Sequence, residues 1–195
     1  DQVDVMAQAG VKAFTLTWNG ENEIGSGHTT DHGLSPFGRA VIPALEERRI
    51  LVDVSHLNDT GFRQVLDIAR RPFVATHSNA RAVCPHRRNL TDDMIREMAA
   101  RKCLIGLNYY VDFLSDAGGA LPGDLRRHVE HFLELGAGEC LALGSDFDGA
   151  HLPEWLNTPG KAAGLYQRFL DWGLTREQAE GILWRNALRF FRENL

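Results

Sequence analysis

The segment ILVDVSH (residues 50–56) is an apolar run that ends on a histidine, and PFVATH (residues 72–77) repeats this arrangement further along the chain. Neither run shows the strict alternation of apolar and polar residues that is typical of half-exposed strands. Continuous apolar runs of this length indicate strands buried on both faces, as in a parallel sheet. Since parallel strands end at the same edge of a sheet, His56 and His77 are predicted to lie at one edge.

Three further apolar runs, at residues 11–18, 103–109 and 140–146, have the same character. Helical patterns lie between the runs and after them, at residues 36–48, 59–70, 91–101, 125–135, 160–172 and 176–194, the last interrupted near residues 184–186. Ser35 and Thr91 are suitable N-caps. The alternation predicts an α/β fold with parallel strands. A (β/α)8 barrel needs eight strands, so five indicate an open sheet or an incomplete barrel.

Length and composition predict one globular α/β domain over residues 1–195, with 44% hydrophobic and 24% charged residues. The net charge of -5 argues against a nucleic-acid partner. No apolar run approaches the ~20 residues of a membrane helix, so no membrane association is expected. The three cysteines, Cys84, Cys103 and Cys140, are irregularly spaced. Buried free thiols are the expected state, which favours a reducing, cytoplasmic location.

Three predicted strand ends carry groups that can bind a metal ion. His56 and His77 end two strands, and Asp146 opens the turn GSDFDG (residues 144–149) after another. Two imidazoles and a carboxylate suit Zn²⁺, with Mn²⁺, Co²⁺ or Fe²⁺ as alternatives. Taken singly, a histidine at a strand end is more often a hydrogen-bonded structural residue than a metal ligand, and aspartates in a glycine-rich turn are more often turn formers. The three groups together favour the metal site.

Two further charged residues stand close to these strand ends in the sequence. Asp53 lies inside an apolar run, where a carboxylate needs a partner; the partner is either a ligand histidine or a buried arginine. Arg88 lies in HRRNLTDD (residues 86–93), after the third strand. An arginine beside a metal site could hold a substrate carboxylate through its two-pronged guanidinium, whereas a plain surface position is the alternative.

The remaining histidines fall in loops or on predicted helix faces. His28 and His32, together with Asp31, lie in the glycine-rich loop after the first strand and could line the mouth of the site. His128 and His131 are three residues apart on a helix face that appears polar in the sequence. We expect both of these side chains to be solvated.

Six motifs in order resemble the membrane (renal) dipeptidase family and its bacterial relatives. They are LTWN, GLSPFG, DVSH, THSNARAV, RRNLTDD and GSDFDG, and the resemblance runs from Phe14 to the C-terminus. Each motif is weak alone, but six in the same order are specific. The resemblance implies a (β/α)8 barrel with a binuclear zinc centre that hydrolyses dipeptides, often with tolerance for a D-residue at the C-terminal position.

The resemblance also implies roles for individual residues. His56 and His77 match the two histidine ligands of one zinc ion. Asp146 matches the carboxylate that binds the other zinc ion and takes part in proton transfer. Arg88 matches the residue that holds the substrate carboxylate. Trp18 stands where mammalian members of the family place a substrate-contacting histidine, so that contact is not expected here.

Two elements of the family pattern are missing, namely a His-x-Asp ligand pair on the first strand and a glutamate that bridges the two metals. We therefore expect the chain to be the C-terminal part of a longer dipeptidase, with about five of eight strands and with one zinc ion or none. Such a part is expected to form a homo-oligomer or to associate with the missing N-terminal portion, and to have little activity alone.

Two other functions agree with the same residues. A related barrel metal hydrolase that acts on a non-peptide amide would use the same ligands. An inactive scaffold that has lost its metals would explain the missing ligands, although it would not need to keep His56, His77, Asp146 and Arg88.

Overall fold

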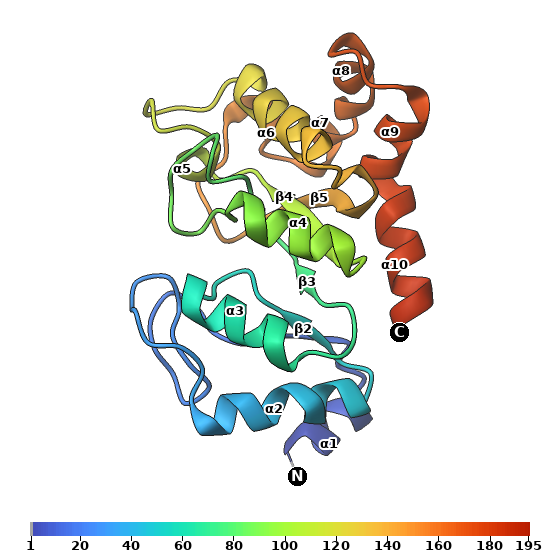
Figure 1. Cartoon of the computed structure of the whole chain (residues 1–195). Coiled ribbons are helices and arrows are strands. Elements are labelled where there is room, and N and C mark those ends of the chain that lie inside the picture. Colours follow the sequence, from blue (N-terminus) through green and yellow to red (C-terminus); the bar gives the residue numbers. More distant parts are fainter. Residues whose placement is uncertain (1) are drawn as a thin grey trace. The chain divides into compact units, whose positions relative to one another are not determined.

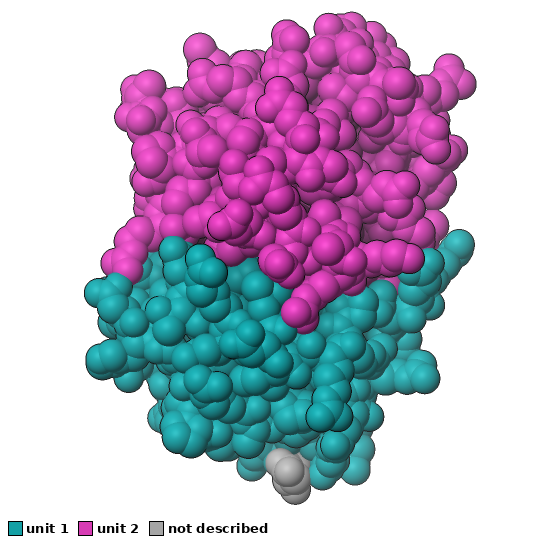
Figure 2. Space-filling view, in the orientation of Figure 1, with its two compact units in different colours: residues 1–75, 191–195 teal, residues 76–190 magenta. Residues whose placement is uncertain are grey.

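The computed structural model of the chain describes residues 2–195. It consists of two compact units: unit 1 comprises Asp1–Ala75 and Phe191–Leu195, and unit 2 comprises Thr76–Phe190 (Figure 2). Parallel strands occur in both units. Each strand lies inside one of the five apolar runs and is shorter than the run, because the outer residues of the run already belong to the adjoining loops.

Unit 1 contains three parallel strands and three helices (Figure 1). Strand β2 pairs in parallel with β1 and with β3, and Asp53 is in register with Thr15 and Val74. Helices α2 and α3 contact each other. The elements of this unit are α1 (Gln2–Gln8), β1 (Ala13–Thr15), α2 (Pro36–Glu47), β2 (Leu51–Asp53), α3 (Asp59–Ile68) and β3 (Val74–Ala75).

Unit 2 contains the parallel pair of β4 and β5 and most of the helices (Figure 1). Its last helix, α10, continues into residues that are counted with unit 1. The elements are α4 (Asp92–Ala100), β4 (Leu104–Asn108), α5 (Val111–Leu114), α6 (Pro122–Glu134), η1 (Gly138–Cys140), β5 (Leu141–Ser145), η2 (Glu154–Leu156), α7 (Pro159–Ala162), α8 (Leu165–Asp171), α9 (Arg176–Glu180), η3 (Gly181–Arg185) and α10 (Asn186–Asn194).

The predicted N-caps are confirmed. The Ser35 hydroxyl accepts a hydrogen bond from the backbone N–H of Gly38 at 2.9 Å, and the Thr91 hydroxyl accepts one from Met94 at 3.3 Å. Each bond satisfies a backbone donor that the first turn of a helix leaves unpaired. Helix α3 buries Phe62 and Val65, which lie on one face of the helix.

Two helices differ from the prediction, and the interruption predicted for a third is confirmed. Helix α6 begins at Pro122 rather than Leu125, because proline fits the first helical position and the Asp124 carboxylate accepts the N–H of Leu121 at 2.7 Å. The predicted helix over residues 160–172 divides at Gly164 into α7 and α8. The expected interruption near residues 184–186 is present as the π-helical turn η3.

The core of each unit is formed by apolar side chains from its strands and from the helices beside them. In unit 1 these include Ile42, Leu45 and Val65, and in unit 2 Ile95 and Phe132, all fully buried. All three cysteines are buried and free, as the sequence predicts. Among the helices of residues 2–195, none has both the length and the apolar character needed to cross a bilayer.

Candidate active site

In unit 1, His56 follows β2 and is oriented by an amide side chain. Its Nδ1 atom lies 3.0 Å from Oδ1 of Asn19, a residue in the segment after β1. An amide oxygen can only accept a hydrogen bond, so Nδ1 carries a proton, and in the neutral ring Nε2 then carries the lone pair. This is the tautomer that a histidine needs when it binds a metal through Nε2.

The buried Asp53 carboxylate is held by hydroxyl and backbone donors. Thr15 Oγ1 donates to Oδ2 at 2.8 Å, while the Ser55 hydroxyl and N–H donate to Oδ1 at 2.6 and 3.0 Å. Asp53 is only 2% exposed, so these donors account for a charge that would otherwise be costly to bury. They fix the turn that leads from β2 to His56.

In unit 2, the peptide that carries His77 is held by two other site residues. The His77 carbonyl oxygen accepts from Nη2 of Arg88 at 3.2 Å and from Nδ2 of Asn108 at 3.5 Å. On the side chain, Nδ1 of His77 lies 2.8 Å from the Thr76 hydroxyl. The half-buried imidazole is therefore positioned both through its own ring and through its backbone.

The backbone that carries Asp146 follows a β-bulge at the end of β5. The register between β4 and β5 shifts after Leu107, so that Asn108 pairs with Ser145 and Gly144 is the extra residue of a bulge. Ser145 and Asp146 then adopt φ values of 52° and 72°. Non-glycine residues rarely occupy this region, and both bulges and such backbone strain gather at functional sites.

The bulge brings the Asp146 side chain to Asn108. The Asn108 amide donates to Oδ2 of Asp146 at 3.1 Å, and its oxygen accepts from the N–H of Tyr110 at 2.6 Å. Asn79 exchanges two further hydrogen bonds of 3.0 Å with the backbone of Asn108. Asn108 is fully buried, so the link between the His77 peptide and the Asp146 carboxylate is rigid.

Two glycines allow the backbone before His77 to approach β4 and β5. A Cβ atom on Gly106 or on Gly144 would lie 2.0 or 2.1 Å from the carbonyl oxygen of Thr76. No side chain fits at such a distance. Gly144, the first glycine of GSDFDG, is therefore required by packing.

Arg88 is buried rather than on the surface, which rules out the surface alternative considered from the sequence. It is 3% exposed, and its guanidinium lies 5.4 Å from the ring centroid of Phe113 on α5. The ring of His86 packs on the same phenylalanine at 4.5 Å, and its Nδ1 accepts the N–H of Arg88 at 3.1 Å. Burial, and after it the positive charge of Arg88, lowers the pKa of His86.

Unit 2 thus brings together His77, Arg88 and Asp146 of the predicted site, with Asn108 between them. His56 belongs to unit 1, so its convergence with His77 and Asp146 stays a prediction. Among residues 2–195, no group of three or more His, Cys, Asp or Glu side chains is arranged to hold a metal ion. Neither unit alone contains all three predicted metal ligands.

Asn108 and Phe113 are not among the site residues predicted from the sequence, and the prediction for His128 is wrong. Asn108 occupies a strand end, as Asp146 does, and this position could have identified it. His128 is not solvated: it is fully buried, its Nδ1 accepts from the N–H of Ala80 at 3.2 Å, and its Nε2 donates to the carbonyl of Leu114 at 3.1 Å. His32 is exposed and lies 3.3 Å from Glu21.

In fold, the chain is similar to metallopeptidases. A metallo peptidase from Rhodobacter sphaeroides, solved with a phosphinate mimic of the dipeptide L-Ala-D-Ala, superposes with a TM-score of 0.94 at 26% identity over 100% of this chain and 59% of that chain. A second structure, of a dipeptidase, gives the same TM-score at 27% identity, over 100% of this chain and 61% of the other.

The chain belongs to the membrane dipeptidase family (peptidase family M19), whose model matches residues 1–194. It is 34% identical to an uncharacterized protein from Klebsiella pneumoniae, and the aligned region covers 94% of this chain and 72% of that protein. It is 30% identical to a dipeptidase of Aspergillus oryzae, over 93% of this chain and 45% of that protein. The chain therefore spans between about half and three quarters of these relatives. The predicted family and fold class, part of an α/β barrel with five parallel strands, are confirmed.

Proposed function

We propose that the protein to which this chain belongs is a zinc-dependent dipeptidase that acts on dipeptides with a free C-terminal carboxylate. The observation that supports this most directly is the hydrogen-bonded set of His77, Arg88, Asn108 and Asp146 in unit 2. The family match and the related metallopeptidase bound to a dipeptide mimic agree with it.

The donors present suit a zinc ion. His56 and His77 each have Nδ1 beside an oxygen atom, at 3.0 and 2.8 Å, as metal-binding histidines generally do. We assign these two imidazoles and the Asp146 carboxylate as zinc ligands, with two ions in the whole family enzyme and one or none held by this chain alone. When bound, zinc supplies a water whose lowered pKa makes it a nucleophile near neutral pH.

Asp146 is assigned a second role, in proton transfer. The Asn108 amide donates to the Oδ2 atom of Asp146 and orients the carboxylate, which takes a proton from the attacking water and passes it to the leaving amine. The strained backbone at Ser145 and Asp146 holds this carboxylate in one direction. A fixed carboxylate does not have to reorganise during the reaction.

Arg88 is assigned to the substrate carboxylate. A guanidinium can bind a carboxylate with two parallel hydrogen bonds, and Arg88 is buried against Phe113 with its direction fixed. A buried arginine at this place favours an anionic group on the substrate. It therefore favours short peptides whose free C-terminus reaches the site.

The location and the association state are also proposed. The three free buried cysteines favour a reducing compartment such as the cytoplasm. Exposed apolar side chains on unit 2, such as Trp184 and Leu188, favour association with a second copy or with the rest of the protein.

The decisive experiment measures zinc-dependent hydrolysis by the full-length protein. The substrates are Ala-Ala, L-Ala-D-Ala, the C-terminal amide of Ala-Ala, and a panel of cyclic amides and lactones. We expect the two dipeptides to be cleaved and the amide to be cleaved at least about tenfold less efficiently, since it lacks the charge that pairs with Arg88. Arg88→Lys should reduce this discrimination. Cleavage of cyclic amides but not dipeptides would contradict the proposal.

A further inference from the structure

Unit 2 contains a cavity of about 790 Å³ outside the site described above. One wall is formed by residues 115–121, between α5 and α6, and the other by residues 151–155, after β5. Two hydrogen bonds join the walls and the segments beside them: Val111 N–H to the His151 carbonyl at 3.1 Å, and Trp155 Nε1 to the Ala120 carbonyl at 2.8 Å. The volume lies within the range of small-molecule sites.

The walls of the cavity come from the chain segments that follow the same strand ends as the site. Val111 lies three residues after Asn108, which ends β4, and His151 lies five residues after Asp146, which follows β5. Both walls are therefore extensions of the loops at the carboxyl ends of β4 and β5. Parallel α/β proteins bind their substrates at this edge.

The lining is acidic. Of its charged residues, Asp124 is paired with Arg127 at 2.8 Å, so these two charges offset each other. The other two carboxylates, Asp116 and Glu154, are exposed. The ammonium group of Lys161 is bound to the carbonyl oxygen of Glu154 and to Asn157. Among the lining residues themselves, the carboxylates of Asp116 and Glu154 leave a net negative charge, which the neighbouring cations Lys161 and Arg168 reduce on the Glu154 side.

The aromatic residue of the lining already has a cation beside it. The guanidinium of Arg168 lies 5.5 Å from the ring centroid of Trp155. The Trp155 indole is also fixed by its bond to Ala120. Trp155 therefore serves as a rigid part of the wall, and the carboxylates of Asp116 and Glu154 are the groups that can distinguish a charged ligand from a neutral one.

We propose that this cavity receives a basic side chain, lysine or arginine, of the dipeptide substrate. The proposal rests on the dipeptidase activity proposed above and adds a preference to it. Asp116 and Glu154 attract the charged end of the side chain, and the apolar lining, which includes Leu121 and Leu152, accommodates its methylene groups. An ion pair between one of these exposed carboxylates and the substrate side chain contributes a modest attraction, which weakens as the salt concentration rises.

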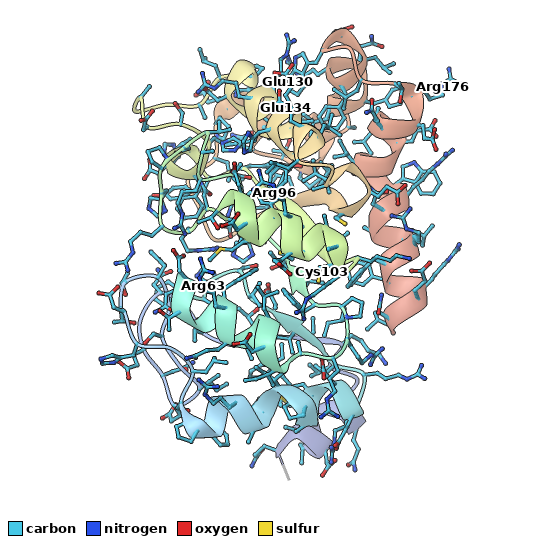
Figure 3. All side chains as sticks on the ribbon, in the orientation of Figure 1. Arg63, Arg96, Cys103, Glu130, Glu134 and Arg176 are labelled. Carbon is cyan, nitrogen blue, oxygen red and sulfur yellow. The ribbon has the colours of Figure 1, made fainter. Side chains whose placement is uncertain are left out.

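The test uses the full-length zinc-loaded protein and compares kcat/KM for Lys-Ala, Arg-Ala and Ala-Lys with that for Ala-Ala. We expect at least one basic dipeptide to be preferred, and Asp116→Asn and Glu154→Gln each to reduce the preference by about fivefold. The preference should also fall as the salt concentration rises. Glu134→Gln is the matched control, because Glu134 lies on α6 (Figure 3), does not line the cavity and is exposed.

The outcomes separate the two proposals. If Ala-Ala is cleaved but no basic dipeptide is preferred, or if the preference survives in the Asp116→Asn/Glu154→Gln double variant, the cavity proposal is wrong and the dipeptidase proposal stands. If no dipeptide is cleaved at all, both are wrong. A loss of preference in Glu134→Gln as large as in the cavity variants would also overturn the proposal, because it would reflect overall charge.

Discussion

The Asn108 side-chain amide donates a hydrogen bond to Oδ2 of Asp146 at 3.1 Å, and the same nitrogen lies 3.5 Å from the carbonyl oxygen of His77. One buried asparagine thus connects the peptide of a predicted metal ligand with the carboxylate predicted to transfer a proton. Asn108 is a positioning residue, because it acts on the site through these two neighbours.

The first prediction concerns the loss of this connection. Asn108→Ala removes the donor to Asp146 and leaves the N–H of Tyr110 without its 2.6 Å acceptor. We expect kcat/KM for dipeptides to fall by about 10- to 100-fold, as for other groups that orient metal ligands, and stability to fall by about 1–3 kcal/mol. Steady-state kinetics and urea unfolding of the full-length protein provide the two measurements.

Asn157→Ala is the matched control, since Asn157 is exposed and its side-chain oxygen accepts a hydrogen bond from the ammonium group of Lys161. It should change neither quantity appreciably. A folded Asn108→Ala protein with unchanged kcat/KM would show that the Asn108 contacts have no role in positioning Asp146.

The second prediction concerns the glycine of the β5 bulge. Gly144→Ala places a Cβ atom 2.1 Å from the carbonyl oxygen of Thr76, so the backbone that carries His77 must move. We expect a loss of at least about 2 kcal/mol in the free energy of unfolding, measured with urea. Gly123→Ala is the control, because nothing lies within 4 Å of its Cβ position; equal stability losses in both variants would refute the packing argument.

The presence of the strands was predictable from the sequence, but their ends were not. The apolar run over residues 72–77 predicts a strand, and burial of both its faces explains the run. Only Val74–Ala75 pair as a strand, because Thr76 and His77 turn toward groups of β4 and its loop. Strand ends depend on contacts that are distant in the sequence, and a single sequence does not reveal them.

The candidate site was predictable to the extent that its residues follow apolar runs or match family motifs. Asp146 and His77 do both. Phe113 does neither: it lies on α5, a helix of four residues without a side-chain N-cap bond, and its contact with Arg88 depends on how the loops fold. His128 could not be predicted for the same reason. Its burial depends on Ala80 and Leu114, which are distant in the sequence and form hydrogen bonds with its ring.

The third prediction concerns the aromatic support of Arg88. Phe113→Leu keeps an apolar side chain but removes the ring that lies against the guanidinium and against His86. We expect KM for dipeptides to rise by about threefold to tenfold with little change in kcat, because the substrate carboxylate loses a fixed partner. Phe37→Leu, at an exposed position of α2, should leave KM unchanged. A fall in kcat alone would contradict this assignment.

The fourth prediction concerns acid stability. Burial lowers the pKa of His128 to about 4, because the charged ring would lose its hydration in the core; the hydrogen bond that Nε2 donates to the Leu114 carbonyl acts in the opposite direction and is outweighed. The unfolded state takes up a proton near pH 6.5 and the folded state only near pH 4. Stability from this group is therefore complete above about pH 6.5 and is lost as the pH falls toward 4, by about 3 kcal/mol.

Urea unfolding between pH 7.5 and pH 4 tests this prediction. In His128→Gln, which retains a donor and an acceptor, the loss of stability on acidification should be smaller by about 3 kcal/mol, although the variant is less stable at neutral pH. His32→Gln provides the control, since it removes a histidine from an exposed position rather than from the core. Identical acid profiles for all three proteins would mean that His128 is protonated as easily in the folded state as in the unfolded chain.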